Sequence, residues 1–441
     1  MSTENKSFEV AIVGGGISGV ILAISLIKRN VPCVIYEQAS AFTEQGVGFG
    51  MTPNAVRAMQ LCDAAVREAF DTVAGQPFQL NFLDGTGAID DSIFQFSIGR
   101  PGKGSRGCHR GQFLKVLLEL VPESMIRFNK QLERIEEPHG AKGKLLMVFS
   151  DGTTAGADAV IGCDGIKSHT RGIVVGHDHP SAKCCRDLRS GKAGYFWGMG
   201  KLKPPAKKHS DTEAPLASQS KAVKMLNPEQ MTHGVNLVGY PVARGTMLNV
   251  VVHCTDTGNW PSETQLTLPA DLEGCLEDVK KLSPRLQKLV QSLKSLDRWG
   301  QFDLGECPPP TYAKGRVCLM GDAAHATTPH QGAGAGFCIE DAAVLASLLA
   351  VDGVRSGPDI EAVFATFNAH RRERGEWLVR TSRRVGELIQ LRSEHKKDFQ
   401  KIESELRSYA AKIWEFDLEM HIREAVDDLN TLLKVDKLCR I

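Results

Sequence analysis

The first forty residues alternate between short apolar runs and a helical spacing of apolar positions. Residues 10–14 form a short run of small and β-branched residues, typical of a strand buried on both faces. Helical spacing follows over residues 17–29, and residues 33–36 form a second apolar run that ends at Glu37. The pattern predicts a strand, a helix and a second strand, which together make a βαβ unit.

Shorter patterns of the same two kinds continue to residue 161. Helices are expected over residues 54–62 and 110–120. Residues 145–149, the turn Asp151-Gly152 and residues 158–161 are expected to form a hairpin.

The second half of the chain changes character twice. Residues 192–300 alternate in a way that favours strands, whereas residues 201–220 are polar, contain three prolines and are interpreted as an exposed loop. Another buried strand is expected over residues 316–320, with a helix from near Gly336. Residues 361–435 are almost continuously helical in pattern, in two or three pieces.

These elements predict an α/β fold with a Rossmann-like dinucleotide-binding domain, an interleaved sheet-rich (α+β) substrate domain and a helical C-terminal part. The expected boundaries are 1–75, 101–175 and 300–390 for the first domain, 76–100 and 176–299 for the second, and 391–441 for the C-terminal helices.

Composition narrows the partners of this chain. Its 441 residues carry a formal net charge of +1, which gives no reason to expect nucleic acid or an anionic membrane as a partner. The N-terminus lacks the basic region of a signal peptide, and glycines interrupt the uncharged run 10–27, so no membrane span is expected. The 12 cysteines include no CxxC pair. Free thiols, no metal site and a cytoplasmic location are therefore expected.

A glycine pattern follows the first strand, at Gly14, Gly16 and Gly19. Gly14 would permit the tight turn, Gly16 would let a pyrophosphate approach the backbone, and Gly19 would let helix and strand pack closely. Glu37, about 20 residues on, would accept hydrogen bonds from ribose hydroxyls and repel a 2′-phosphate, so NADPH is not expected at this site. A purely structural glycine turn is the alternative.

Two further motifs follow strands. One is Asp164-Gly165, and the other is Gly321-Asp322, which continues into Pro329-His-Gln-Gly332-Ala333-Gly334. With the N-terminal glycines, and with the segment 107–114, they resemble the single-component FAD-dependent aromatic hydroxylases. The resemblance is strongest to the salicylate hydroxylase-like and the fungal phenol-dearomatising enzymes.

This resemblance implies tightly bound, non-covalent FAD and transiently bound NADH or NADPH. The reductant and O2 would form a flavin C4a-hydroperoxide that hydroxylates a small aromatic substrate. A role in secondary metabolism and a monomer or homodimer fit such an enzyme. Epoxidation or oxidative rearrangement of a non-phenolic substrate such as an indole is an alternative. A non-catalytic binding protein of the same fold is a remote one.

The resemblance also implies roles for the residues at the flavin. Asp322 would bind the ribityl chain, Arg110 would neutralise charge near the phosphates, and Asp164 would serve both FAD and the nicotinamide cofactor. Amides of Gly332, Ala333 and Gly334 would face the flavin pyrimidine, with Pro329 packed on the ring. For Asp322 the alternative is a helix N-cap, for Asp164 a turn residue, and for Arg110 a surface helix residue. A structural role is favoured for His325 over a catalytic one.

For the substrate, Tyr240 lies where the dearomatising relatives carry a substrate-orienting tyrosine, although a tyrosine that anchors a strand is the alternative. Those relatives commonly have an arginine where this chain has Trp197. Trp197 can stack on an aromatic ring but cannot pair with a carboxylate, which favours a larger or neutral substrate over salicylate. If the alignment is shifted, Arg244 or His253 would serve instead.

Overall fold

The structure, a computed structural model, is described here for residues 6–42, 48–84, 96–99, 103–137, 143–184, 194–202, 221–226, 234–255, 260–262, 265–269, 272–280, 282–293 and 296–439. Most of the loop expected over residues 201–220, and residues 85–95 of the expected substrate domain, lie outside these ranges.

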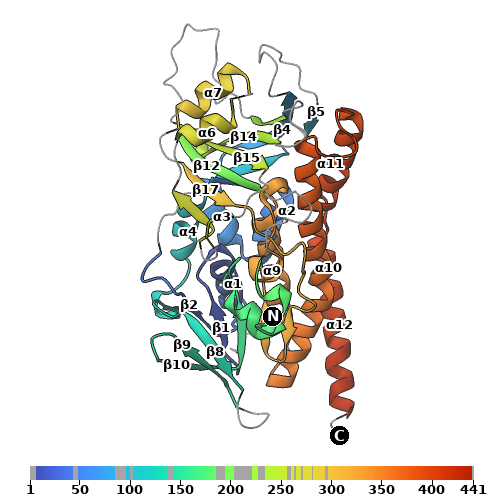
Figure 1. Ribbon diagram of the computed structural model, residues 1–441. Helices are drawn as coiled ribbons and strands as arrows, with labels where there is room; N and C mark the ends of the chain where they lie inside the picture. Colours follow the sequence, from blue (N-terminus) through green and yellow to red (C-terminus); the bar gives the residue numbers. More distant parts are fainter. Residues whose placement is uncertain are drawn as a thin grey trace.

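A six-stranded sheet forms the core of the lower half of the molecule (Figure 1). Its order is β18-β19-β11-β1-β2-β7, and β1 runs parallel to both β2 and β11. The strands are β1 (Val10–Val13), β2 (Cys33–Tyr36), β7 (Ile126–Arg127), β11 (Ala159–Gly162), β18 (Ala313–Lys314) and β19 (Val317–Leu319). β1, β11 and β19 are fully buried, as their continuous apolar sequences predict.

Helices cover this sheet and connect its strands. Those of the N-terminal half are α1 (Ile17–Ile27), α2 (Pro53–Cys62), α3 (Ala64–Val73), α4 (Arg110–Leu118) and α5 (His169–Val175). Two more, α8 (Asp322–His325) and α9 (Gly334–Leu349), follow β19. α9 packs against both α1 and α2, and most of its side chains are buried.

The predicted hairpin is wrong in its second strand. β9 (Leu145–Phe149) pairs with β10 (Thr154–Ala157) and with β8 (Leu132–Glu136) in a small three-stranded sheet. The next strand, β11, leaves this sheet and runs parallel to β1. Residues 159–161 are apolar on both faces, so they are best buried inside the central parallel sheet rather than in a half-exposed hairpin.

A larger mixed sheet forms the upper half, with the order β16-β17-β12-β15-β14-β13-β4-β6-β3 and β5 paired to β4. Its strands are β3 (Gly48–Met51), β4 (Pro77–Asp84), β5 (Phe96–Ile98), β6 (Ser105–His109), β12 (Gly194–Leu202), β13 (Lys221–Leu226), β14 (Val235–Val242), β15 (Met247–Thr255), β16 (Thr267–Pro269) and β17 (Asp297–Gly300). Helices α6 (Leu272–Asp278) and α7 (Pro284–Gln291) form a second hydrophobic core with β14 and β15.

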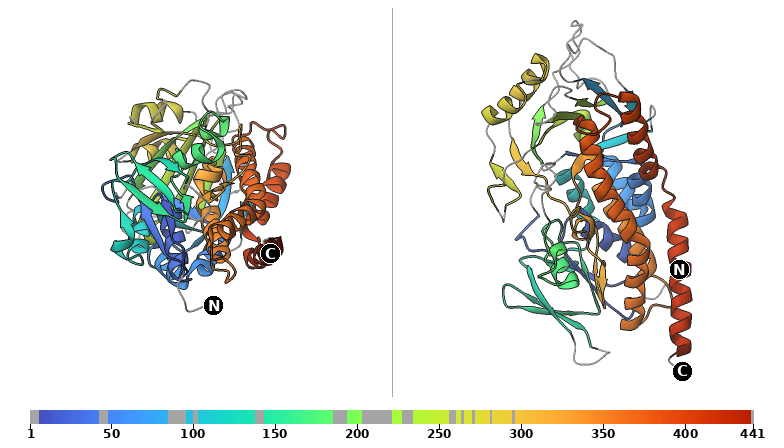
Figure 2. Two further views of the ribbon diagram at one scale, coloured as in Figure 1. Left: turned by 90° about the horizontal axis from the view of Figure 1, so that it is seen from below. Right: turned by 45° about the vertical axis from the view of Figure 1, so that its right-hand side comes forward.

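Three C-terminal helices run along one side of both sheets (Figure 2). They are α10 (Gly357–Ile389), α11 (Phe399–Trp414) and α12 (Leu418–Cys439), which confirms the expected helical pattern in three pieces. α10 contacts α9 and the turn that holds Pro329, while α11 packs on β5. No helix of the described residues is both long and apolar enough to cross a membrane. The predicted fold class is confirmed, with its Rossmann-like unit, sheet-rich unit and C-terminal helices.

Candidate active site

Three of the predicted motifs and Glu37 lie at one edge of the six-stranded sheet. Gly14 follows β1, Glu37 follows β2, Asp164 follows β11 and Gly321 follows β19. These four strands are parallel neighbours, so their carboxyl ends meet at the same edge. In open α/β sheets, ligands bind in the crevice beyond this edge, where the chain changes its direction of winding.

The three glycines of the first turn have different surroundings. Gly14 has φ +106°, and a Cβ there would lie 2.5 Å from the carbonyl oxygen of Cys163. A Cβ on Gly19 would lie 2.0 Å from the carbonyl oxygen of Gly14, whereas a Cβ on Gly16 would meet nothing within 4 Å. Gly14 and Gly19 therefore serve the turn and its packing, while the space beside Gly16 is open to a ligand.

Glu37 is fixed by the backbone around it. One carboxylate oxygen accepts a hydrogen bond from the amide of Gly15 at 2.7 Å, and the other accepts one from the amide of Ala39 at 2.8 Å. A carboxylate oxygen can accept a second hydrogen bond, so this group remains suited to ribose hydroxyls.

A polar crevice of about 710 Å³ runs past this turn, and Arg110 and Asp164 line it together with the glycines and Glu37. Arg110, half-buried at the start of α4, has no hydrogen bond or ion pair with a described residue. Burial lowers its pKa, and the charges of Asp322 and Glu37 oppose that shift. A guanidinium in this position is available to a bound phosphate.

The two carboxylate oxygens of Asp164 have different surroundings. One carboxylate oxygen accepts hydrogen bonds from the amide and hydroxyl of Thr170, both at 2.9 Å, which anchors the start of α5. The other oxygen is buried and has no partner among the described residues. An unpartnered oxygen in the crevice, an unpaired guanidinium and the open space at Gly16 fit a dinucleotide such as FAD.

Asp322 is not the N-cap of its helix. The N-cap is Gly321, with φ +64°, and no side chain caps it. The Asp322 side chain is exposed in a second cavity that it helps to line. Desolvation by the surrounding protein raises the pKa of its carboxyl, against the opposing charges of His325, Arg110 and Arg171. The carboxylate has no hydrogen bond from a described residue, which suits it to bind a ligand.

The second cavity, called the chamber below, has a volume of about 280 Å³. Pro329, Gly332, Ala333 and Gly334 form one wall, next to Asp322. The larger sheet forms the opposite wall, with Phe49, Phe78, Leu80, Val238, Tyr240, Val251 and His253. A mostly apolar cavity with a few polar groups is typical of a site for a small organic ligand.

Tyr240 lies in the chamber, with its ring stacked on Phe78 at 5.8 Å between centroids. Its hydroxyl donates a hydrogen bond to the carbonyl oxygen of Gly48 at 2.8 Å. Burial raises the pKa of this hydroxyl, so it stays protonated. The hydroxyl therefore anchors β3, which is the alternative considered above, and its oxygen can still accept a hydrogen bond from a ligand.

The other residues considered for substrate contact are Trp197, His253 and Arg244, and the pairing of β12 with β15 fixes the backbone positions of the first two. The backbone of Trp197 in β12 pairs with Val252, whereas Phe196 pairs with His253. His253 lines the chamber. Arg244 is exposed in the turn between β14 and β15 and is not part of the chamber wall.

A buried charged network, which the motifs did not reveal, supports the Gly321-Asp322 turn. Asp341 of α9 accepts hydrogen bonds from the amide of Gly321 at 3.1 Å, from His325 at 2.6 Å and from Arg371 at 2.7 Å. Although burial alone would raise it, the pKa of Asp341 is held at about 2 by His325 and Arg371. Arg371 also pairs with Glu340 at 2.9 Å. His325 therefore has a structural contact, as expected.

A second buried cation connects two motifs. Arg171 of α5 is fully buried and donates to the carbonyl oxygens of Ile166, Ser181 and Ala323 at 2.9–3.0 Å. It thereby joins the loop after Asp164 to the turn after Asp322. A signal was present in the sequence, since charged residues inside apolar helical segments need buried partners.

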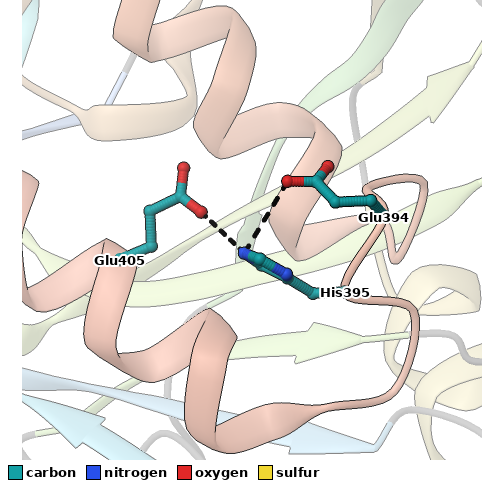
Figure 3. A group of neighbouring side chains, drawn as sticks. All are labelled: Glu394, His395 and Glu405. Atoms are coloured by element: carbon teal, nitrogen blue, oxygen red, sulfur yellow. Dashed lines mark hydrogen bonds and ion pairs between the residues drawn. The ribbon is translucent and has the colours of Figure 1, made fainter.

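A third cluster lies outside the active site, where Glu394, His395 and Glu405 approach one another (Figure 3). Nε2 of His395 is 2.9 Å from Glu405 and 3.8 Å from Glu394. Arg384 pairs with both carboxylates, at 2.7 Å to Glu405. Because Arg384 already pairs with both carboxylates, the arrangement serves to connect α10, the following loop and α11.

Comparisons with known proteins agree with this geometry. The family model described as "FAD binding domain" matches residues 7–180 and 271–382. The FAD-dependent monooxygenase pigN of Monascus ruber is 36% identical over 98% of this chain and 99% of its own length. Salicylate hydroxylase asL1 of Sarocladium schorii is 34% identical over 99% of this chain and 94% of its own length.

Solved structures show the same relationship. A salicylate hydroxylase in a substrate complex has a TM-score of 0.77 at 28% identity and covers 95% of this chain and 98% of its own. CtdE with FAD and a substrate has a TM-score of 0.79 at 18% identity over 97% and 100%, which shows the shared fold. The chain therefore belongs to the FAD-binding-domain family, within the FAD-dependent monooxygenases of the salicylate hydroxylase type.

Proposed function

We propose that this monooxygenase hydroxylates a small aromatic substrate, phenolic or related, with NADH or NADPH as reductant. One atom of O2 would be inserted at a C–H bond of the ring, which becomes C–OH, and the other would leave as water with two protons. The nicotinamide would supply the two electrons. Bound FAD would supply the chemistry that passes these electrons to oxygen, while the protein supplies binding and orientation.

The cofactor would lie across the crevice and one wall of the chamber. In this proposal the diphosphate approaches Gly16 and Arg110, and Glu37 binds the ribose of the adenosine half. Asp322 holds the ribityl chain, Asp164 supports the same region, and Pro329 packs on the ring. Amides of Gly332, Ala333 and Gly334, at the start of α9, would stabilise negative charge on the reduced ring.

One observation carries the substrate class. The chamber is walled by aromatic and aliphatic side chains and opens on the segment that contains Pro329 and Gly334. Apolar walls exclude water, which would otherwise divert activated oxygen to hydrogen peroxide. Tyr240 and His253 line the chamber and offer polar contacts for substrate oxygens.

The nicotinamide cofactor would bind transiently and elsewhere. Both oxygens of Glu37 already accept backbone hydrogen bonds, and their charge would repel the 2′-phosphate of NADPH. NADPH is therefore not expected at the first turn, which we propose holds FAD.

The test is a panel of phenols and indoles supplied to purified holoenzyme with NADH or NADPH. Hydroxylation predicts substrate-stimulated oxidation of the nicotinamide and a product heavier by one oxygen atom. Hydrogen peroxide as the only product from every substrate would contradict the proposal. Loss of carbon dioxide from the product would instead indicate salicylate-like decarboxylative chemistry.

A further inference from the structure

Strands β14 and β15 present two different faces. Val250 and Val252 of β15 and Leu237 of β14 belong to the core beneath α6 and α7. The opposite face carries three cross-strand pairs: Asn236 with His253, Val238 with Val251, and Tyr240 with Asn249. The middle pair is apolar, and the two flanking pairs are polar. Four of these six residues line the chamber: Val238, Tyr240, Val251 and His253.

The His253 end is built from buried polar groups. His253 is 4% exposed, and its Nδ1 lies 3.2 Å from the amide nitrogen of Gln301. The ring of His330 lies 5.0 Å away between centroids. The Gln301 amide can present either its nitrogen or its oxygen to Nδ1 of His253. The imidazole can therefore adopt either tautomer, so it suits a ligand that donates a hydrogen bond or one that accepts a hydrogen bond.

Asn236 adds an observation that points to a ligand. Its side chain is 0% exposed, and neither its amide nitrogen nor its amide oxygen has a hydrogen-bond partner among the described residues. An unsatisfied buried amide is costly, and native structures rarely retain one without a reason. Asn236 is the cross-strand neighbour of His253 and lies on the same sheet face, behind the end of the chamber wall that His253 forms.

We propose that His253, held by Gln301 and flanked by the unpaired amide of Asn236, forms a second polar end of the chamber that binds an oxygen substituent of the substrate far from Tyr240. Asn236 and Tyr240 are four residues apart on β14, a backbone distance of about 13 Å. The substrate class is therefore an extended aromatic compound, bicyclic or acyl-substituted, with oxygen functions at both ends. This inference rests on the proposed function and specifies its substrate.

The experiment compares two probes that differ by one hydroxyl group, 2-naphthol and 2,6-dihydroxynaphthalene. Their dissociation constants with holoenzyme are measured by calorimetry without NAD(P)H, so that binding is separated from turnover. Wild type should bind the diol up to about tenfold more tightly, the value of one net hydrogen bond.

Two variants and a matched control locate the effect. In His253→Phe the ring shape remains, and the preference for the diol should disappear. Asn236→Leu should reduce the preference too, yet raise Tm by a few degrees without ligand, because it removes an unsatisfied buried amide. Asn249→Leu removes a buried asparagine at the Tyr240 end, and should change both dissociation constants alike.

Equal affinity for both probes in wild type, or an unchanged preference in His253→Phe, would overturn the second polar end. Asn236→Leu that lowers Tm and leaves the preference intact would show that the amide is structural. Failure of the proposed function is distinct from these results, since it would appear as the absence of bound FAD or of any oxygenated product.

Discussion

The polar crevice and the chamber are built by different means. The crevice is formed by the backbone at the ends of parallel strands, where Gly14, Gly16 and Gly321 follow directly on buried apolar runs. The chamber is formed by one face of a mixed sheet, where the chemistry depends on which side chains the strand register brings together. We therefore expect few substitutions to be tolerated in the crevice, and we expect single side-chain substitutions in the chamber to change which ligands it binds.

Gly19→Ala should have the largest effect on the crevice, because its Cβ would lie 2.0 Å from the carbonyl oxygen of Gly14. Folded protein should be lost. The matched variant Gly16→Ala has nothing within 4 Å of its Cβ, so it should fold normally and lose FAD affinity. Thermal unfolding and the flavin-to-protein ratio distinguish the two. If Gly16→Ala retained the FAD content of wild type, the pyrophosphate of FAD would not bind against this turn.

Asp341→Asn tests whether the buried ion pair between Asp341 and Arg371 stabilises the fold around the Gly321-Asp322 turn. It leaves Arg371 incompletely paired in the core, which costs about 3–5 kcal/mol of unfolding free energy. The pKa of Asp341 is lowered from 3.8 to about 2, so its stabilisation is complete above about pH 4 and disappears as the pH falls through 2. Denaturant unfolding at several pH values should show this acid-dependent component in wild type and not in the variant. An identical pH profile for both proteins would refute it.

Asp322→Ala should separate cofactor binding from folding. The carboxylate makes no hydrogen bond with a described residue, so its loss should cost the fold little. A hydrogen bond from FAD to a charged group contributes about 1.5–3 kcal/mol, which predicts FAD binding weaker by roughly 10- to 100-fold. Fluorescence titration with FAD measures this. A variant that stays fully flavinated and active would show that Asp322 has another role.

Tyr240→Phe acts on the chamber and should have a smaller effect. It removes the hydrogen bond to Gly48, worth about 1 kcal/mol, and leaves the ring stacked on Phe78. We expect a raised KM for the phenol, with flavin content unchanged. Loss of FAD from this variant would show that the chamber wall also contributes to cofactor binding in the crevice.

His395→Ala provides the baseline, away from both regions. The cluster in Figure 3 is largely at the surface, so its loss should cost at most about 1 kcal/mol. Activity should not change. Addition of Zn²⁺ to wild type should leave Tm unchanged, and an increase in Tm that requires His395 would instead indicate a metal site.

The crevice could be predicted from the sequence and the chamber largely could not, for a physical reason. Turns such as Gly14 to Gly19 and Gly321-Asp322 depend on local backbone conformation, which the residue types specify. The pairing of Asn236 with His253 depends on the register of two strands, and the contacts of Trp197 depend on a third. Residues 158–161 show the same limit, because an apolar run fits either a hairpin or a central parallel strand until its partners are known.

Part of the buried charged network around Asp341 could be predicted from the sequence. Glu340 and Asp341 interrupt an apolar helical segment, which indicates buried partners, but the sequence does not say that Arg371 and His325 supply them. Arg171 likewise follows the Asp164-Gly165 motif in the sequence. Only the fold shows that its guanidinium donates a hydrogen bond to the carbonyl oxygen of Ala323.

The central claim is that the crevice holds FAD so that oxygen is transferred to an aromatic ring in the adjoining chamber. The most direct measurement combines the FAD content of the purified chain with product mass after turnover under isotopically labelled O2. The account predicts one FAD per chain and one labelled oxygen atom in the aromatic product. A chain that neither retains FAD nor takes it up, or that leaves every aromatic substrate unlabelled, would contradict it.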